Sequence, residues 1–226
     1  MKNTQHKLTD DSFRFPYWGP FVMETKIDDE FIDLLVEKGI ESRDKKLYHR
    51  TRLAGMIDNE YYFDEFEDWF VPKFIPYINN YVEGIITAYS ADRKFFPAPI
   101  AGWTIESFWI NYQKANEYNP PHHHEGDLSF IIYLQVPKEI AEEHENAKGE
   151  RNNPGPGMVV FEYGVQMPFA IAAHYRLPAV GDLLIFPAWL PHHVHAFKSD
   201  VERISVSGNL RFKYEDGGLE TRSFSV

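Results

Sequence analysis

A chain of 226 residues with 43% hydrophobic and 25% charged residues has the composition of one folded domain rather than of a disordered segment. Its formal net charge of −11 at pH 7 repels phosphate and anionic lipid, so we expect no nucleic-acid partner and no membrane partner. The sequence contains no cysteine, which excludes disulfides, thiolate metal sites and cysteine nucleophiles.

The sequence also carries no signal for a membrane or for secretion. No run approaches the ~20 apolar residues that a membrane-spanning helix needs. Residues 1–11 are polar and lack the apolar centre of a secretory signal peptide. We therefore expect an intracellular, cytoplasmic protein.

Two amphipathic segments predict helices in the first part of the chain. The segment Ile27–Ile40 has apolar residues at helical spacing, with Asp28 where an N-cap belongs. In the segment Tyr61–Ala88, apolar residues recur three or four positions apart, which favours a longer helix packed on a sheet. Pro72 and Pro76 lie inside this second segment, so we expect them to break or bend the helix.

Beyond residue 100 the apolar period changes to two, which is typical of strands. Short strands separated by proline and glycine turns indicate an antiparallel sandwich or barrel. The acidic segment Lys138–Lys148 predicts a short surface helix between them. The predicted strands are Trp103–Gln113, Leu128–Val136, Met158–Tyr163, Phe169–Leu177, Asp182–Phe186 and Arg203–Tyr214, with His192–Phe197 as a shorter candidate.

Helices followed by strands predict an α+β fold. We expect one domain over residues 1–226. In it, a helical N-terminal layer, residues 1–95, buttresses a double-stranded β-helix, or jelly-roll, core at residues 100–214.

The segment Pro120–Asp127, with the sequence Pro-Pro-His-His-His-Glu-Gly-Asp, concentrates candidate metal ligands between two predicted strands. Side chains alternate along a strand, so His122 and His124 share one side while His123 points to the other. A jelly roll places the end of an early strand beside the start of a late one, so Pro191–His195 is the natural source of a third ligand. Neutral imidazole binds divalent iron, zinc, nickel and copper well, and the two clusters therefore predict a metal site.

The residues alone leave the ligand set open. The opposing interpretation is a turn of surface histidines paired with acidic residues, but two clusters flanked by prolines and strands favour the metal site. The possible pairs in the first cluster are His122 with His124, His123 with Glu125, and His124 with Asp127, and the third ligand is His192, His193 or His195.

Arg203 stands at the start of a predicted strand, shortly after the second histidine cluster. There it can enter the same end of the barrel as the histidines. Its planar guanidinium suits a carboxylate that accepts two parallel hydrogen bonds. The alternative is an exposed strand residue paired with Glu202 or Asp200.

Several motifs in the second half of the chain belong together. They are Asn111-Tyr112-Gln113, His122-x-His124, Asp127-Leu128-Ser129, Tyr133-Leu134, the segment Gly181–Pro187, Trp189-Leu190-Pro191-His192 and Arg203-Ile204-Ser205. Together they resemble the 2-oxoglutarate and iron(II)-dependent oxygenase superfamily, in its branch of small oxygenases often met in bacteriophage genomes, with the pattern of prolyl hydroxylases. The resemblance covers roughly residues 100–212, and residues 20–90 loosely resemble the helical lead-in of that branch.

The resemblance implies an enzyme that uses iron(II), 2-oxoglutarate and dioxygen. Such an enzyme decarboxylates 2-oxoglutarate oxidatively to succinate and couples this to hydroxylation of a C–H bond, here in an unidentified substrate. By position, His122 would be the first iron ligand in the sequence and His192 the last. Arg203 would bind the distal carboxylate of 2-oxoglutarate. Tyr112, Tyr133 and Ser205 would assist Arg203.

One position departs from the superfamily, which normally has Asp or Glu two residues after the first histidine. This chain has His124 there. Either His124 binds and the site has three histidines, or Asp127 supplies the carboxylate, or the position is vacant and could admit a halide for halogenation. We rank the three-histidine site first.

Two other functions compete with the oxygenase. One is a cupin-like metalloenzyme that does not use 2-oxoglutarate, and the other is a jelly roll that binds a ligand without catalysis. The position of Arg203 relative to the histidines distinguishes the first of these from an oxygenase.

Overall fold

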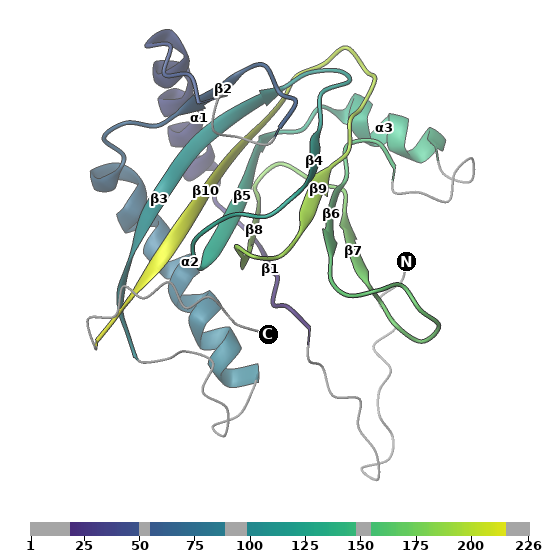
Figure 1. Ribbon diagram of the computed structural model, residues 1–226. Helices are drawn as coiled ribbons and strands as arrows, with labels where there is room; N and C mark the ends of the chain where they lie inside the picture. Colours follow the sequence, from purple (N-terminus) through teal and green to yellow (C-terminus); the bar gives the residue numbers. More distant parts are fainter. Residues whose placement is uncertain (1–18, 50–54, 89–98, 148–154, 216–226) are drawn as a thin grey trace.

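The computed structural model describes residues 19–49, 55–88, 99–147 and 155–215. In the first part of the described chain, strands and helices alternate, and the later part consists of strands and one short helix (Figure 1). In chain order the elements are β1 (Met23–Lys26), α1 (Asp29–Asp44), β2 (Glu60–Tyr62), α2 (Glu67–Ala88), β3 (Ile100–Gln113), β4 (Asn119–His122), β5 (Leu128–Gln135), α3 (Lys138–Ala147), β6 (Val159–Glu162), β7 (Ala173–Arg176), β8 (Asp182–Pro187), β9 (His192–Val194) and β10 (Arg203–Tyr214).

The strands form two antiparallel sheets. The larger sheet has the order β1-β8-β5-β10-β3-β2, and the smaller has the order β4-β9-β6-β7. The long strand β10 pairs with β3 from Arg203 opposite Gln113 to Tyr214 opposite Ile100. In the smaller sheet β4 pairs with β9, which places the two histidine clusters in neighbouring strands.

Helix α1 forms where its apolar spacing and its cap predict a helix. The carboxylate of Asp28 accepts a hydrogen bond of 2.8 Å from the backbone N–H of Phe31. This bond satisfies one of the free N–H groups at the helix start. Phe31 and Leu35 are buried on the same side of the helix, one turn apart, and both belong to the larger core cluster.

Helix α2 runs through Pro72 and Pro76, so the predicted break is not observed. Each interior proline costs about 3 kcal/mol or more, because it removes a backbone hydrogen bond. The helix buries Phe70, Phe74 and Ile78 completely, at roughly 1.5–3 kcal/mol for each side chain, which offsets that cost. Among the helices of the described residues, none has the length and apolar character needed to cross a bilayer.

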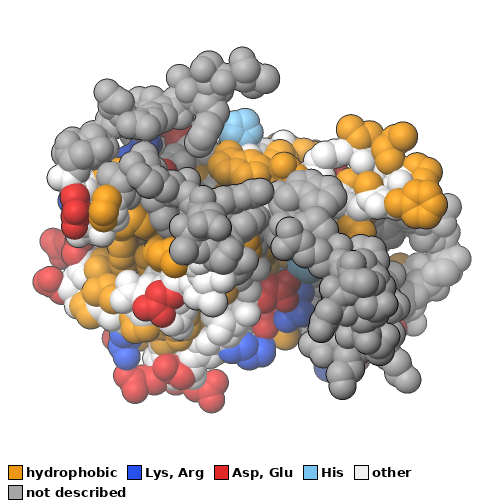
Figure 2. Space-filling view, turned by 90° about the horizontal axis from the view of Figure 1, so that it is seen from below, with side chains coloured by type: hydrophobic (Ala, Val, Ile, Leu, Met, Phe, Trp, Pro, Cys, Tyr) orange, Lys and Arg blue, Asp and Glu red, His pale blue; other side chains and the backbone are white. Residues whose placement is uncertain are grey.

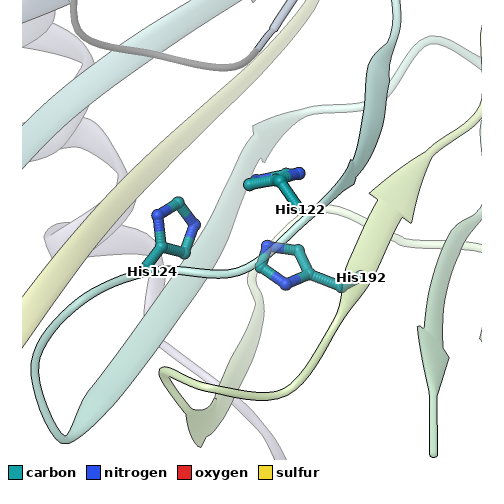
Figure 3. Close-up of side chains that lie close together, drawn as sticks. All are labelled: His122, His124 and His192. Carbon is teal, nitrogen blue, oxygen red and sulfur yellow. The ribbon is translucent and has the colours of Figure 1, made fainter.

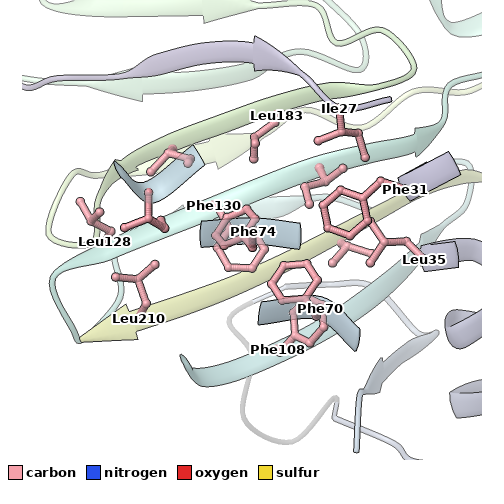
Figure 4. Packing of buried hydrophobic residues seen from close by; sticks show 14 of the residues in the cluster. Ile27, Phe31, Leu35, Phe70, Phe74, Phe108, Leu128, Phe130, Leu183 and Leu210 are labelled. Carbon is pink, nitrogen blue, oxygen red and sulfur yellow. The ribbon is translucent and has the colours of Figure 1, made fainter. Parts of the chain in front are cut away.

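The hydrophobic core has two parts, one on each face of the larger sheet. The first part packs α1 and α2 against the sheet, with the ring of Phe70 4.2 Å from Phe108 and 5.7 Å from Phe130 (Figure 4). The second part lies between the two sheets and includes Ile131 and Tyr133. Because β5 is buried on both faces, it has the continuous apolar run Phe130–Leu134 instead of alternating.

The strand predicted at Phe169–Leu177 is wrong at its start, because β7 begins only at Ala173. The backbone of Phe169 has φ = 67°, in the left-handed region that a strand cannot contain. The loop before β7 therefore carries exposed apolar side chains, and Figure 2 shows hydrophobic side chains gathered on the side of the molecule where β6 and β7 lie in Figure 1. Those of the loop are Val165, Met167, Phe169 and Ile171.

Candidate metal centre

Three histidines from two distant segments converge in the smaller sheet. His122 ends β4 and stands opposite His192, the first residue of β9. His124 follows β4, and its backbone N–H donates a 2.9 Å hydrogen bond to the carbonyl of Ala188. One ring nitrogen from each histidine lies within 4.8 Å of the others, and Figure 3 shows the three rings turned toward a common space. This arrangement can hold one metal ion.

Backbone hydrogen bonds orient two of these rings. Nδ1 of His122 lies 2.7 Å from the carbonyl oxygen of Pro120, and Nδ1 of His192 lies 3.0 Å from that of Leu190. A carbonyl can only accept, so both rings carry their proton on Nδ1. This leaves the lone pair of Nε2 free, which is the usual state of a metal-binding imidazole.

Burial keeps the three imidazoles neutral. Together with a smaller effect of the neighbouring histidines, it lowers the pKa of His192 to about 3 and that of His124 to about 4. Burial also lowers the pKa of His122. Neutral imidazole is the form that binds a metal, so the site is ready for a cation at neutral pH without first releasing protons.

The carboxylate of Asp127 has a different partner. Its Oδ2 accepts a 2.7 Å hydrogen bond from the backbone N–H of Phe212. The backbone N–H of Asp127 donates to Leu210, and its carbonyl accepts from Ala188. Asp127 therefore joins the start of β5 to β10, and among the described residues it is not part of the convergent group.

The other sequence candidates in the two clusters also lie outside that group. His123 and Glu125 are exposed. His193 alternates with His192 and so lies on the opposite face of β9, and the ring of His195, just after the strand, lies beside that of His193.

Arg203 is buried, with only 2% of its surface exposed, so the interpretation as an exposed strand residue is wrong. Its Nη1 donates a 2.5 Å hydrogen bond to the carbonyl of Gly157, and Nη2 donates to Oε1 of Gln113. The guanidinium carbon lies 5.5 Å from the ring centre of Tyr133 and 5.8 Å from that of Phe197. Burial lowers the pKa of Arg203, but a guanidinium remains charged in a protein.

One nitrogen of this guanidinium and one neighbouring hydroxyl are buried and have no hydrogen-bond partner within the described part of the chain. They are Nε of Arg203 and the hydroxyl oxygen of Tyr133. A buried cation with no carboxylate beside it is costly, and an unpaired hydroxyl adds to that cost. A carboxylate ligand in this corner of the inter-sheet core could accept hydrogen bonds from both groups.

Ser205 lies next to this corner, and Tyr112 does not. Ser205 pairs with Tyr133 in the sheet, and its hydroxyl lies 3.4 Å from Nδ2 of Asn111. Tyr112 points to the other face of β3, where it packs in the core under the helices with Arg43 4.6 Å from its ring centre. Because strand residues alternate, the site receives Asn111 and Gln113 instead of Tyr112.

Asn111 and Gln113 were not predicted as site residues. A signal for them was present in the sequence, since both are polar at alternate positions at the end of β3, directly after the apolar run Phe108–Ile110. Asn111 also accepts a 3.0 Å hydrogen bond from the indole N–H of Trp109. This bond connects the Arg203 corner to the wall of the metal centre.

A cavity of about 30 Å³ lies at the three histidines, which is space for a metal ion and about one water. None of its walls carries a carboxylate, lysine or arginine. Besides the histidines, it is lined by Trp109, Asn119, Ser129, Phe130, Ile131, Phe186, Val194, Ser207 and Asn209.

A larger cavity of about 230 Å³ lies at the edge formed by β1 and β8 and shares no lining residue with the histidine cavity. Its charged walls pair with one another: Asp182 binds Lys26 at 2.8 Å and Arg176 at 3.0 Å. The cavity is lined by no histidine, so the small histidine cavity is the better candidate for a catalytic centre.

Comparison with known proteins agrees with this geometry. Residues 107–209, a little under half of the chain, match a family model described as "Putative 2OG-Fe(II) oxygenase". A prolyl-4-hydroxylase from Pseudomonas putida is similar in structure, with a TM-score of 0.55 and 12% identity over 84% of this chain and 91% of that one. The non-heme alpha ketoglutarate dependent carbocyclase SnoK from nogalamycin biosynthesis is similar with a TM-score of 0.54 and 12% identity, over 88% and 84% of the two chains.

A search among curated proteins found no match. At such low identity the two solved structures show that the fold is shared with 2-oxoglutarate oxygenases. Over residues 107–209 the chain therefore matches the 2OG-Fe(II) oxygenase family, as its sequence motifs predicted, and this family implies iron(II) and 2-oxoglutarate as cofactors, for which the three histidines could bind the iron.

Proposed function

We propose that the protein is an iron(II)- and 2-oxoglutarate-dependent dioxygenase. It couples the oxidative decarboxylation of 2-oxoglutarate to the hydroxylation of a C–H bond in a primary substrate that is still to be identified. The observation that carries this proposal is the combination of three convergent, neutral imidazoles with a buried guanidinium that has no carboxylate partner among the described residues.

The two parts of this site belong to one core. Phe186 lies 4.8 Å from the ring of His192 and shares the inter-sheet cluster with Tyr133. Tyr133 in turn lies under the guanidinium of Arg203. Arg203 and Tyr133 do not line the cavity at the histidines, so 2-oxoglutarate bound to both parts of the site would have to displace side chains of the inter-sheet core.

Each residue has a defined part in the proposed reaction. His122, His124 and His192 hold iron(II), which supplies the activation of dioxygen when 2-oxoglutarate is bound. Arg203 and the hydroxyl of Tyr133 hold the distal carboxylate of 2-oxoglutarate, with Ser205 beside them. Apolar walls, such as Phe186 and Val194, keep water from the reacting atoms.

The fold fits this assignment. We propose that the two sheets form a double-stranded β-helix, or jelly roll, and that α1 and α2 form its helical N-terminal layer; the antiparallel pairing of the strands supports this. We take residues 1–226 as one domain with this layout, of which the structure describes the ranges given above.

The first experiment measures the cofactors directly. In the absence of oxygen, the purified protein should bind one iron(II), and addition of 2-oxoglutarate should produce the visible charge-transfer band of a 2-oxoglutarate–iron(II) chelate. In air, succinate should then form slowly even without primary substrate.

The variants separate the proposal from its rivals. The double variant His122→Ala, His192→Ala should lose iron, the band and succinate, while His174→Gln, on the exposed strand β7, should keep all three. Unchanged iron binding in the double variant would refute the proposed ligands. Iron binding with no band and no succinate would instead identify a cupin-like metalloenzyme that does not use 2-oxoglutarate.

A further inference from the structure

Two histidines on the outer face of β9 lie outside the site described above. Along β9, His192 and Val194 point into the inter-sheet core, where both are buried. His193 alternates with them and points to the other side of the smaller sheet, and the ring of His195, just after the strand, lies beside that of His193. They therefore face away from the space that His122, His124 and His192 enclose.

The spacing of the two outer rings matches a chelate. Nε2 of His193 and Nε2 of His195 form a 3.1 Å hydrogen bond, so a metal ion bound between them would take the place of the proton they share. A cation at about 2.0–2.1 Å from two imidazole nitrogens separates them by about 2.9 Å in octahedral geometry and about 3.4 Å in tetrahedral geometry. The observed separation falls inside this range, so a metal ion can bind both nitrogens with little movement of either ring.

A carboxylate stands behind one of the two rings. Oε2 of Glu162 lies 3.9 Å from Nδ1 of His193, and this Nδ1 is buried with no hydrogen-bond partner in the described residues. Glu162 is held there because β6 pairs with β9, with Phe161 opposite His192. A small rotation of the Glu162 side chain would let Nδ1–H donate to it, which fixes the proton on Nδ1 and leaves the Nε2 lone pair for a metal.

We propose that His193 and His195 form a second metal site, on the outer face of the smaller sheet, with Glu162 orienting His193. Two imidazoles suit Cu²⁺, Ni²⁺ or Zn²⁺ rather than Ca²⁺ or Mg²⁺, which prefer oxygen. Water completes the coordination, so this site binds more weakly than the three-histidine centre. It does not depend on the proposed oxygenase activity.

The test counts metal ions and locates them. The metal-free full-length chain is titrated with NiCl₂ by calorimetry, and crystals soaked in zinc chloride are measured at the zinc absorption edge. We expect two equivalents of Ni²⁺ per chain and an anomalous peak between His193 and His195. The double variant His193→Gln, His195→Gln should bind one equivalent and lose the peak.

Three further variants make the result specific. Glu162→Gln should lower the affinity for the second Ni²⁺ by about 10- to 100-fold without abolishing its binding. This is the usual effect of losing a carboxylate that is hydrogen-bonded to a metal-binding histidine. His174→Gln should leave both binding events unchanged. The double variant His122→Gln, His192→Gln should lose the Ni²⁺ at the three-histidine centre but keep the one at His193 and His195. The proposal is overturned if the His193, His195 double variant, folded by circular dichroism, binds as many equivalents as the wild type.

Discussion

His122 and His192 stand directly opposite each other in the antiparallel pairing of β4 with β9, with ring centres 4.3 Å apart. The pairing joins two segments that are remote in the sequence and sets both imidazoles on the inner face of one sheet. Because the sheet register fixes this relationship, the metal centre does not depend on a flexible loop for two of its ligands.

The ligand set can be tested by replacing each candidate. We expect His124→Ala to weaken iron(II) binding by more than about 100-fold, because loss of a ligand costs more than loss of its supporting hydrogen bond. Asp127→Asn should leave the affinity within a fewfold of wild type, because its carboxylate is bound to the N–H of Phe212. Calorimetric titration with iron(II) without oxygen measures both. If only Asp127→Asn loses iron, Asp127 is the ligand in place of His124.

Arg203→Met should separate stability from cofactor binding. Without 2-oxoglutarate the variant should lose little stability, because removal of a buried cation with no carboxylate partner offsets the loss of its hydrogen bonds to Gly157 and Gln113. Its affinity for 2-oxoglutarate should fall by about 10- to 100-fold, because charge-assisted hydrogen bonds to a carboxylate contribute about that much to binding. Thermal unfolding with and without 2-oxoglutarate measures both effects, and Arg211→Met, which removes a partner of Glu106, is the matched control.

Stability of the metal-free protein should fall on acidification. Burial lowers the pKa of His192 to about 3 and that of His124 to about 4, below the value of about 6.5 in the unfolded chain. Between these values the unfolded chain binds more protons, so the stabilising contribution is complete above about pH 6.5 and is lost progressively toward about pH 3.

Urea unfolding at several pH values from about 7 to 4 measures this dependence. Carboxylates whose pKa is lowered, such as Asp182, add a slope of the same sign. The comparison is therefore with the triple variant His122→Gln, His124→Gln, His192→Gln, which should have a shallower slope. Equal slopes would show that these imidazoles are not buried as neutral groups.

Asp182 should contribute more to stability than any exposed ion pair. It is 2% exposed and binds Lys26, Arg176 and the backbone N–H of Ala179. Asp182→Ala removes the buried acceptor that these three groups share, and we expect a loss of about 2–3 kcal/mol in the free energy of unfolding. Glu30→Ala, which removes an exposed and solvent-screened pair with Lys73, should change that free energy much less. Urea unfolding of both variants provides the measurement, and a smaller effect at Asp182 would contradict this assignment.

The sequence determined the local features of this protein. Alternation along a strand predicted that His122 and His124 share a side, and the cap at Asp28 and the apolar spacing predicted α1, because these signals depend only on neighbouring residues. The motifs around them predicted the family that residues 107–209 match.

Tertiary structure decided which of these residues meet. The sequence could not show that Asp127 is bound to β10, because its partner, the N–H of Phe212, is 85 residues away. It also could not show that Tyr112 faces the helices while Asn111 and Gln113 face the site, because alternation leaves open which face is which. Only the packing of α1 and α2 on one face of the larger sheet, and of the smaller sheet on the other, decides this orientation.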